Sequence, residues 1–241
     1  MTEAVAIETH SFRDLRAFAR AATIAADGHG DPFLASRAAL DLPQGPVSVY
    51  LIALPQGRGR VQNLPDDEFL ILIDGALTLE TSDSTTQIAP HQSVVVTKGT
   101  GFAWSSREGA RLIAMRRNGS PDAEPAIIPI DESAPLEPSG APLAELLVGP
   151  TPNCRNFTDY RSGDGEFVCG TWDSTPYHRL PMPYRHYELM HLLEGSVTFV
   201  DGAGREGSFA RGDIFLVEQG AHCSWESREH VKKVYAIYRP I

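Results

Sequence analysis

The strongest constraint on the fold is that the sequence repeats itself once. The segment EFLILIDG, which begins at Glu68, corresponds to ELMHLLEG, which begins at Glu188, at an offset of 120. VSVYLIAL and FVCGTWDS share this offset, and WSSRE from Trp104 corresponds to WESRE from Trp225 at an offset of 121. Several landmarks in one register, with a single one-residue slip, indicate two copies of one folding unit.

Each copy shows short apolar runs separated by turn residues, which is typical of β-strands. In the second copy we expect strands at 167–173, 187–193, 196–200, 206–210, 213–218, 223–226 and 231–239. In the first copy we expect them at 47–54, 68–73, 76–81, 86–89, 92–97, 102–105 and 110–116. Asp201-Gly202 marks a tight hairpin turn. Many short antiparallel strands close into a sandwich or barrel, so the expected class is all-β with tandem barrels.

One helix is expected, near the N-terminus, opening at Ser11. Its apolar residues Phe12, Leu15, Phe18 and Ala22 would lie on one face. The expected fold is therefore a pair of β-barrels with a short N-terminal helix.

The repeat also predicts the domain boundaries. One barrel is expected in 1–118 and the other in 151–241, joined by residues 119–150. This connection holds seven prolines, which argue against a helix or a central strand. A disordered linker is one alternative, but Ile127, Ile128 and Ile130 need burial. We therefore expect an ordered, extended connection.

The composition of the chain limits the classes of partner that it is expected to bind and the cellular compartment in which it is expected to occur. The formal net charge is −10, which argues against nucleic acid and against anionic membrane surfaces. The three cysteines form no CxxC pair, and this pattern fits a reducing compartment. The first ten residues carry no basic and apolar leader pattern, and no apolar run approaches the ~20 residues of a membrane span. A cytoplasmic protein is expected.

Two segments of the second copy resemble a known family. Glu188-x6-Gly, followed by Gly212-Asp-x4-Glu-x-Gly, resembles the two signature segments of the cupin superfamily. The ending WESREHVKKVYAIYR, with Trp225, Glu229 and Lys233, resembles the branch of ethanolamine-utilisation cupins and (S)-ureidoglycine aminohydrolase-like cupins. The first copy is similar but eroded. The resemblance implies double-stranded β-helix (jelly-roll) barrels with an internal ligand pocket.

Many cupins hold Mn, Fe, Ni or Zn in that pocket. The resemblance places the usual ligand positions of the second copy at Met182, Tyr184, Glu188 and Cys223. Only Glu188 is a usual ligand for a hard metal, so no intact metal site is expected. The corresponding positions of the first copy are Gln62, Leu64, Glu68 and Phe102, where no metal is expected. If a metal binds the second copy, an improvised set of His178, His186 and Glu188 is the alternative.

The candidate catalytic residues are Glu188 and Tyr184. Inside a barrel, a glutamate is either an architectural ion-pair partner or a general acid or base with a raised pKa. Ligand contacts are expected from Trp172, Arg185, His186, Cys223 and Trp225, although the tryptophans also serve as core filling. His186 is expected to share the face of Glu188, and His191 the opposite face. Glu229 and Lys233 are expected to form a salt bridge or to cap a turn.

Three functions remain open at this point. A protein that binds a small polar metabolite in the second barrel is slightly preferred. The alternative is an enzyme, a hydrolase, lyase or isomerase acting on an amide, ureide or amine with Glu188 as acid or base, with or without a metal. A scaffold is the third. A homodimer is expected, because open barrel edges invite pairing between subunits, and light scattering tests it.

Overall fold

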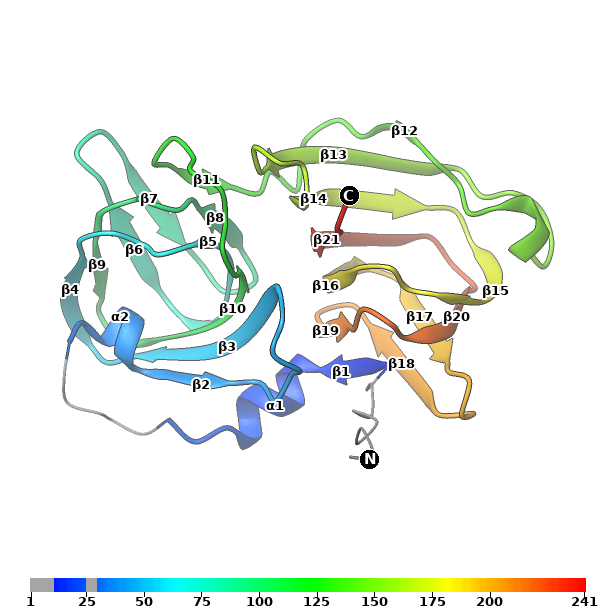
Figure 1. Cartoon of the computed structure of the whole chain (residues 1–241), viewed down its shortest axis with the longest axis horizontal. Helices are drawn as coiled ribbons and strands as arrows, with labels where there is room; N and C mark the ends of the chain where they lie inside the picture. The colour runs from blue at the N-terminus through cyan, green and yellow to red at the C-terminus, as the bar shows by residue number, and fades with distance from the viewer. Residues whose placement is uncertain (1–10, 25–29) are drawn as a thin grey trace, which may run out of the picture.

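The computed structural model describes residues 11–24 and 30–241. Within them the chain forms two β-barrels that lie side by side, each built from one large and one small antiparallel sheet (Figure 1). The fold class is therefore all-β with tandem barrels, as the repeat and the strand pattern predict.

The first barrel has a six-stranded and a four-stranded sheet. In spatial order the larger sheet consists of β11 (Ile127–Pro129), β8 (Ser93–Val96), β5 (Asp67–Gly75), β10 (Ala110–Arg117), β3 (Val47–Leu54) and β2 (Arg37–Ala39). The smaller sheet consists of β4 (Gly57–Val61), β9 (Phe102–Ser106), β6 (Leu77–Glu80) and β7 (Thr85–Ile88).

The second barrel has a seven-stranded and a four-stranded sheet. In spatial order the larger sheet consists of β1 (Phe12–Asp14), β19 (Ile214–Val217), β16 (Tyr187–Glu194), β21 (Val231–Tyr238), β14 (Phe167–Ser174), β13 (Cys154–Arg161) and β12 (Glu137–Ser139). The smaller sheet consists of β15 (Tyr177–Pro183), β20 (His222–Ser227), β17 (Ser196–Val200) and β18 (Glu206–Ala210). All fourteen predicted strands have a counterpart; the sequence missed mainly edge strands.

Some strands belong to a different barrel from the one predicted by the boundaries 1–118, 119–150 and 151–241. β1 precedes the first barrel in the chain but pairs with β19 of the second. β11 belongs to the predicted connection 119–150 but pairs with β8 of the first barrel. β12, from the same connection, covers the edge of β13. Each exchange covers an otherwise open sheet edge, and the connection is ordered and extended as expected.

The N-terminal helix is shorter than predicted. α1 spans Leu15–Ala21, and the Asp14 side chain caps it by accepting a hydrogen bond from the Ala17 backbone nitrogen. Residues 12–14, expected to be helical, form β1 instead. Their pairing with β19 outweighs the helical periodicity, because helix propensity is a weak preference that tertiary contacts override. The short helix α2 (Pro32–Ala35) and the 3-10 turn η1 (Ala144–Leu146) were not predicted.

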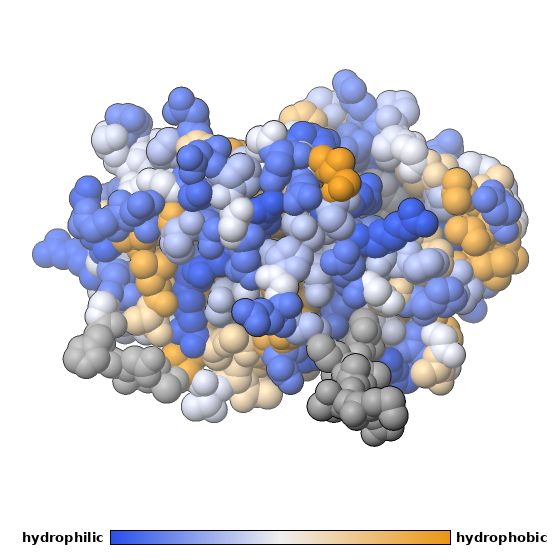
Figure 2. Space-filling view, viewed as in Figure 1, coloured by the Kyte–Doolittle hydropathy of each residue, from blue (hydrophilic) through white to orange (hydrophobic). Residues whose placement is uncertain are grey.

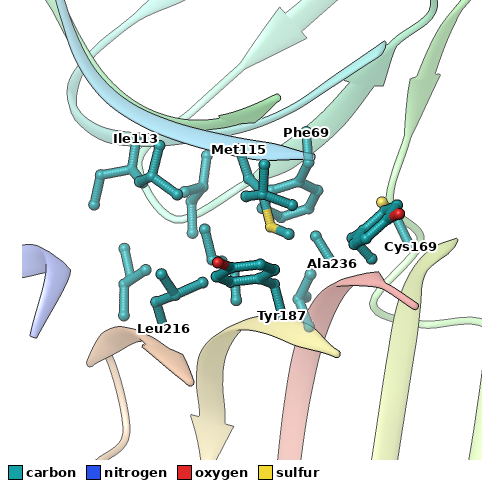
Figure 3. Close-up of a cluster of buried hydrophobic side chains, with 14 of the residues drawn as sticks. Phe69, Ile113, Met115, Cys169, Tyr187, Leu216 and Ala236 are labelled. Atoms are coloured by element: carbon teal, nitrogen blue, oxygen red, sulfur yellow. The ribbon is translucent and has the colours of Figure 1, made fainter. Parts of the chain in front are cut away.

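Three apolar clusters account for the packing. One face of each large sheet packs inside its own barrel, which gives one cluster in the first barrel and another in the second. The opposite faces of the two large sheets pack against each other and form the third cluster. Between the sheets, Phe69, Ile113 and Met115 of the first barrel pack against Tyr187 and Leu216 of the second (Figure 3). Strands buried on both faces explain the continuous apolar runs of the sequence.

The surface is mostly hydrophilic on the face shown in Figure 2. Hydrophobic colour gathers at the edge of the second barrel where β15 lies. Leu143, Val148 and Leu180 are exposed large hydrophobic residues in that part of the chain. No helix of the described residues is long and apolar enough to cross a membrane.

Candidate functional site

The site is built around Glu188 on β16. Tyr187 and Leu189 belong to the cluster between the barrels, so the strand alternation turns Glu188 and Met190 into the second barrel. Lys233 on the neighbouring strand β21 donates from Nζ to Glu188 Oε1 at 2.7 Å. The same ammonium lies 3.1 Å from the sulfur of Met190.

His186 completes the hydrogen bonding of the carboxylate. Its Nε2 lies 3.2 Å from Glu188 Oε2, so the two side chains share one face as their two-residue spacing predicts. Both carboxylate oxygens of Glu188 are therefore engaged, one by Lys233 and one by His186. All three side chains are at least nine-tenths buried.

Aromatic rings surround the Lys233 ammonium. Its Nζ lies 4.7 Å from the ring centroid of Trp172 and 5.1 Å from that of Trp225. The two indoles meet edge to face, and Tyr177 stacks on Trp225 at 5.6 Å with an angle of 10° between the planes. Cation–π contacts of this kind stabilise a buried ammonium and hold it in place.

A pocket of about 690 Å³ opens beside this group. Glu188, Lys233, His186 and the rings of Trp172 and Trp225 line it. The remaining polar and aromatic lining comes from both large-sheet and small-sheet strands, and includes Asn156, Thr158, Tyr177, Arg179, Tyr184 and Tyr235. The volume falls in the range of small-molecule pockets.

Arg179 and Tyr184 form a second polar group in the pocket wall. Arg179 Nη2 donates to the Tyr184 hydroxyl at 3.0 Å, and the guanidinium lies 5.4 Å from the centroid of that ring. Burial raises the pKa of Tyr184 well above its usual range, because the nearby Arg179 offsets only part of the burial effect. Tyr184 is therefore a protonated phenol at neutral pH.

Glu188 is ionised. Burial by itself would raise the pKa of its carboxyl group, but the Lys233 ammonium and the hydrogen bond from His186 outweigh burial and hold the pKa well below the usual range. A carboxylate stabilised in this way has little tendency to take up a proton near pH 7.

The structure brings together most of the predicted site residues. Tyr184, His186, Glu188 and the two tryptophans line one pocket. Two predicted ligand contacts need correction. Arg185 lies in the connection between β15 and β16, where it is exposed and does not line the pocket.

Cys223 is the second correction. It faces into the barrel but is completely buried in the apolar cluster rather than among the lining residues of the pocket. Burial raises the pKa of its thiol to about 12. A thiol in this environment is protonated at neutral pH, which disfavours it as a nucleophile.

The residues present do not fit a divalent metal. Among the described residues no group of three His, Cys, Asp or Glu side chains converges. His178, proposed for an improvised site, is not among the residues that line the pocket. Lys233 is hydrogen-bonded to Glu188, so that an ammonium lies where a metal ion would need to meet the carboxylate.

Sequence reasoning missed the roles of Lys233 and Arg179. Lys233 was expected at a turn with Glu229, but it lies within β21 and pairs with Glu188, whereas Glu229 accepts a hydrogen bond from Ser196. The available signal was the alternation of Val231, Lys233 and Tyr235, which places the lysine on an inward face. Arg179 carried no comparable signal.

In the first barrel the corresponding position is closed to solvent. Glu68, the counterpart of Glu188, has no exposed side-chain area. Arg37 donates to both of its oxygens at 2.6 and 3.1 Å, and Arg116 donates at 2.7 Å. The two guanidiniums make this glutamate an architectural ion-pair partner.

Comparison with known proteins finds a family match within the second barrel. Residues 161–235 match the model of the EutQ-like cupin domain. A comparison with functionally curated proteins gave no match.

Solved structures share the fold over most of the chain. A protein of unknown function from Pseudomonas syringae pv. tomato is 28% identical, with a TM-score of 0.80 over 86% of this chain and 88% of its own. A Cupin 2 conserved barrel domain protein from Leptotrichia buccalis is 12% identical, with a TM-score of 0.60 over 98% of this chain and 99% of its own. The salicylate 1,2-dioxygenase of Pseudaminobacter salicylatoxidans, at 11% identity and a TM-score of 0.53 over 84% and 76%, shares the fold alone. The chain therefore folds as two cupin-type barrels, and residues 161–235 of the second barrel match the EutQ-like cupin domain.

Proposed function

We propose that this protein binds a small polar metabolite in its second barrel. The observation that carries the proposal is the pocket of about 690 Å³ beside the Glu188–Lys233 pair. A mixture of aromatic walls and a few fixed polar groups is typical of small-molecule sites.

One difference between the two barrels is consistent with open space in the second barrel. In the first barrel Arg37 pairs in register with Ile52, and its side chain reaches Glu68. In the second barrel Asn156 pairs in register with Trp172, the counterpart of Ile52. The short Asn156 side chain leaves the volume that the arginine fills in the first barrel. The second barrel is thus an unfilled version of the first.

Binding has more support than catalysis by Glu188. The alternative is a hydrolase, lyase or isomerase that uses Glu188 as acid or base on an amide, ureide or amine. A general acid or base works best with a pKa near the operating pH. The pKa of Glu188 is held well below that range, and both oxygens already accept hydrogen bonds.

The test is a thermal-shift screen of a library of small metabolites against the wild type and Asn156→Arg. The variant introduces the arginine of the first barrel into the pocket and should block it. A ligand at about 100 times its Kd stabilises a protein by about 2.7 kcal/mol. This corresponds to a rise in Tm of roughly 5–10 °C for a chain of this length. We expect such rises with the wild type and none with Asn156→Arg.

Thr85→Arg is the matched control, because it adds the same charge at an exposed position of the first barrel. It should respond to ligands as the wild type does. A library without pocket-dependent ligands, or ligands that stabilise Asn156→Arg equally, would contradict the proposal.

A further inference from the structure

One buried cation of the second barrel has no anionic partner. Arg179 is only 4% exposed. In the part of the chain that the structure describes, no carboxylate oxygen lies within 4.0 Å of its guanidinium, whereas Arg37 and Lys233 each contact a glutamate. An arginine cannot lose its proton to escape burial, so an unpaired guanidinium in a protein interior calls for an anion.

The existing contacts of Arg179 leave most of its hydrogen-bonding capacity unused. Nη2 donates to the Tyr184 hydroxyl at 3.0 Å, and Nη1 lies at 3.5 Å from the Leu180 carbonyl. A guanidinium has five N–H donors in a planar fork that matches a carboxylate. Because the Tyr184 hydroxyl accepts from Arg179, its own proton is free to be donated to a ligand.

The charge of the pocket lining is opposite to that of the chain. The protein has a formal net charge of −10. The pocket is nevertheless lined by Arg161, Arg179, Lys233 and Arg239 against the single carboxylate side chain of Glu188. Since Glu188 and Lys233 neutralise each other, the excess positive charge inside the pocket is at Arg179, and the mouth adds two exposed arginines.

We propose that the metabolite bound by the second barrel carries a carboxylate, and that Arg179 binds this group together with the Tyr184 hydroxyl. The inference rests on the proposed function and specifies its ligand class. The rings of Trp172, Tyr177 and Trp225 lie in the same pocket and favour a planar remainder of the ligand.

The test uses matched acids and amides as probes: benzoate with benzamide, and indole-3-acetate with indole-3-acetamide. Each pair has nearly the same shape and differs in charge. Binding is followed by thermal shift and by tryptophan fluorescence, which reports on the pocket through Trp172 and Trp225. We expect the acids to bind the wild type at least 10-fold more tightly than the amides, because charge-assisted hydrogen bonds are the stronger kind.

Arg179→Met should weaken acid binding about 10- to 100-fold and leave the amides unaffected. Arg211→Met is the matched control, since it removes the same charge from an exposed position of the second barrel that does not line the pocket, and it should change acid binding less than threefold. The preference of the wild type for acids over amides tests the inference even if Arg179→Met does not fold.

The outcomes separate the two proposals. Amides that bind as well as acids, or acids that bind Arg179→Met as well as the wild type, would overturn the carboxylate assignment and leave the pocket a binding site. The carboxylate assignment is also overturned if no probe binds and the metabolite screen finds only uncharged or cationic ligands. Loss of their binding in Asn156→Arg would still identify the pocket as their site. If neither the probes nor the screen yield pocket-dependent binding, both proposals fall.

Discussion

At the scale of single residues, the pairing of Glu188 with Lys233 decides the chemistry of the second barrel. A buried carboxylate without partners would be protonated, but here an ammonium and an imidazole hold it ionised. The aromatic rings of Trp172 and Trp225 hold the ammonium in turn. The charges of Glu188 and Lys233 therefore balance each other. Among the described residues the guanidinium of Arg179 has no such carboxylate partner.

Removing one partner of this pair should be costly. We expect Lys233→Met to lower the free energy of unfolding at pH 7 by about 3 kcal/mol, because a buried carboxylate loses its cation. Urea denaturation measures this. The double variant Lys233→Met with Glu188→Gln should recover part of the loss, since no buried charge is then left unpaired. A double variant with the summed loss of both single variants would contradict this interpretation.

The same pair predicts a dependence on pH. The folded-state pKa of Glu188 lies below its ordinary value of 4.5. The ionised carboxylate therefore stabilises the fold above about pH 4.5, and this contribution is lost as the pH falls below that value toward the lower folded-state pKa. The difference in unfolding free energy between the wild type and Lys233→Met should shrink as the pH falls from 7 toward 3. A constant difference would show that Lys233 acts through packing alone.

At the scale of elements, the close approach of β13 and β14 forms one wall of the pocket. A Cβ atom added at Gly170 on β14 would lie 2.1 Å from the Phe157 carbonyl oxygen on β13. The pairing shifts register between Thr158 and Tyr160, next to this contact. Only a glycine allows β13 to lie so near, and Thr158 then contributes to the pocket lining.

Gly170→Ala should therefore destabilise the protein by about 2 kcal/mol, as expected for overpacking against backbone. It should also weaken ligand binding, because β13 must move away from β14. Gly163→Ala is the matched control, since its Cβ would meet no atom within 4 Å, and it should change stability by less than about 0.5 kcal/mol. Urea denaturation of both variants gives the comparison, and equal stability would contradict the close approach.

At the scale of the whole molecule, the two barrels form one structural unit. Their large sheets share an apolar cluster, and the buried Tyr160 hydroxyl donates to Asp67 across the interface at 2.7 Å. Arg117 of the first barrel pairs with Asp164 and Glu166 of the second at 2.6 and 2.7 Å. Together with the exchange of β1 and β11, these contacts couple the barrels. The homodimer stays a prediction.

We therefore expect a single calorimetric unfolding transition for the full chain. Met115→Asp introduces a carboxylate between the sheets and should lower the Tm of that one transition by several degrees. Thr85→Asp, at an exposed position of the first barrel, should leave the Tm nearly unchanged. Two separate transitions in the wild type would show that the barrels unfold independently.

Local patterns sufficed to predict the strands, the duplication and the direction of several side chains. A period of two residues turns Glu188 inward and His191 to the opposite face of the sheet, and this depends only on the backbone of β16. Contacts between distant strands had no such local signature. Lys233 meets Glu188 because β21 and β16 become neighbours, and Arg37 fills the first barrel because β2 lies beside β3. Which strands pair, and hence which barrel stays open, follows from global closure and burial, which no short segment encodes by itself.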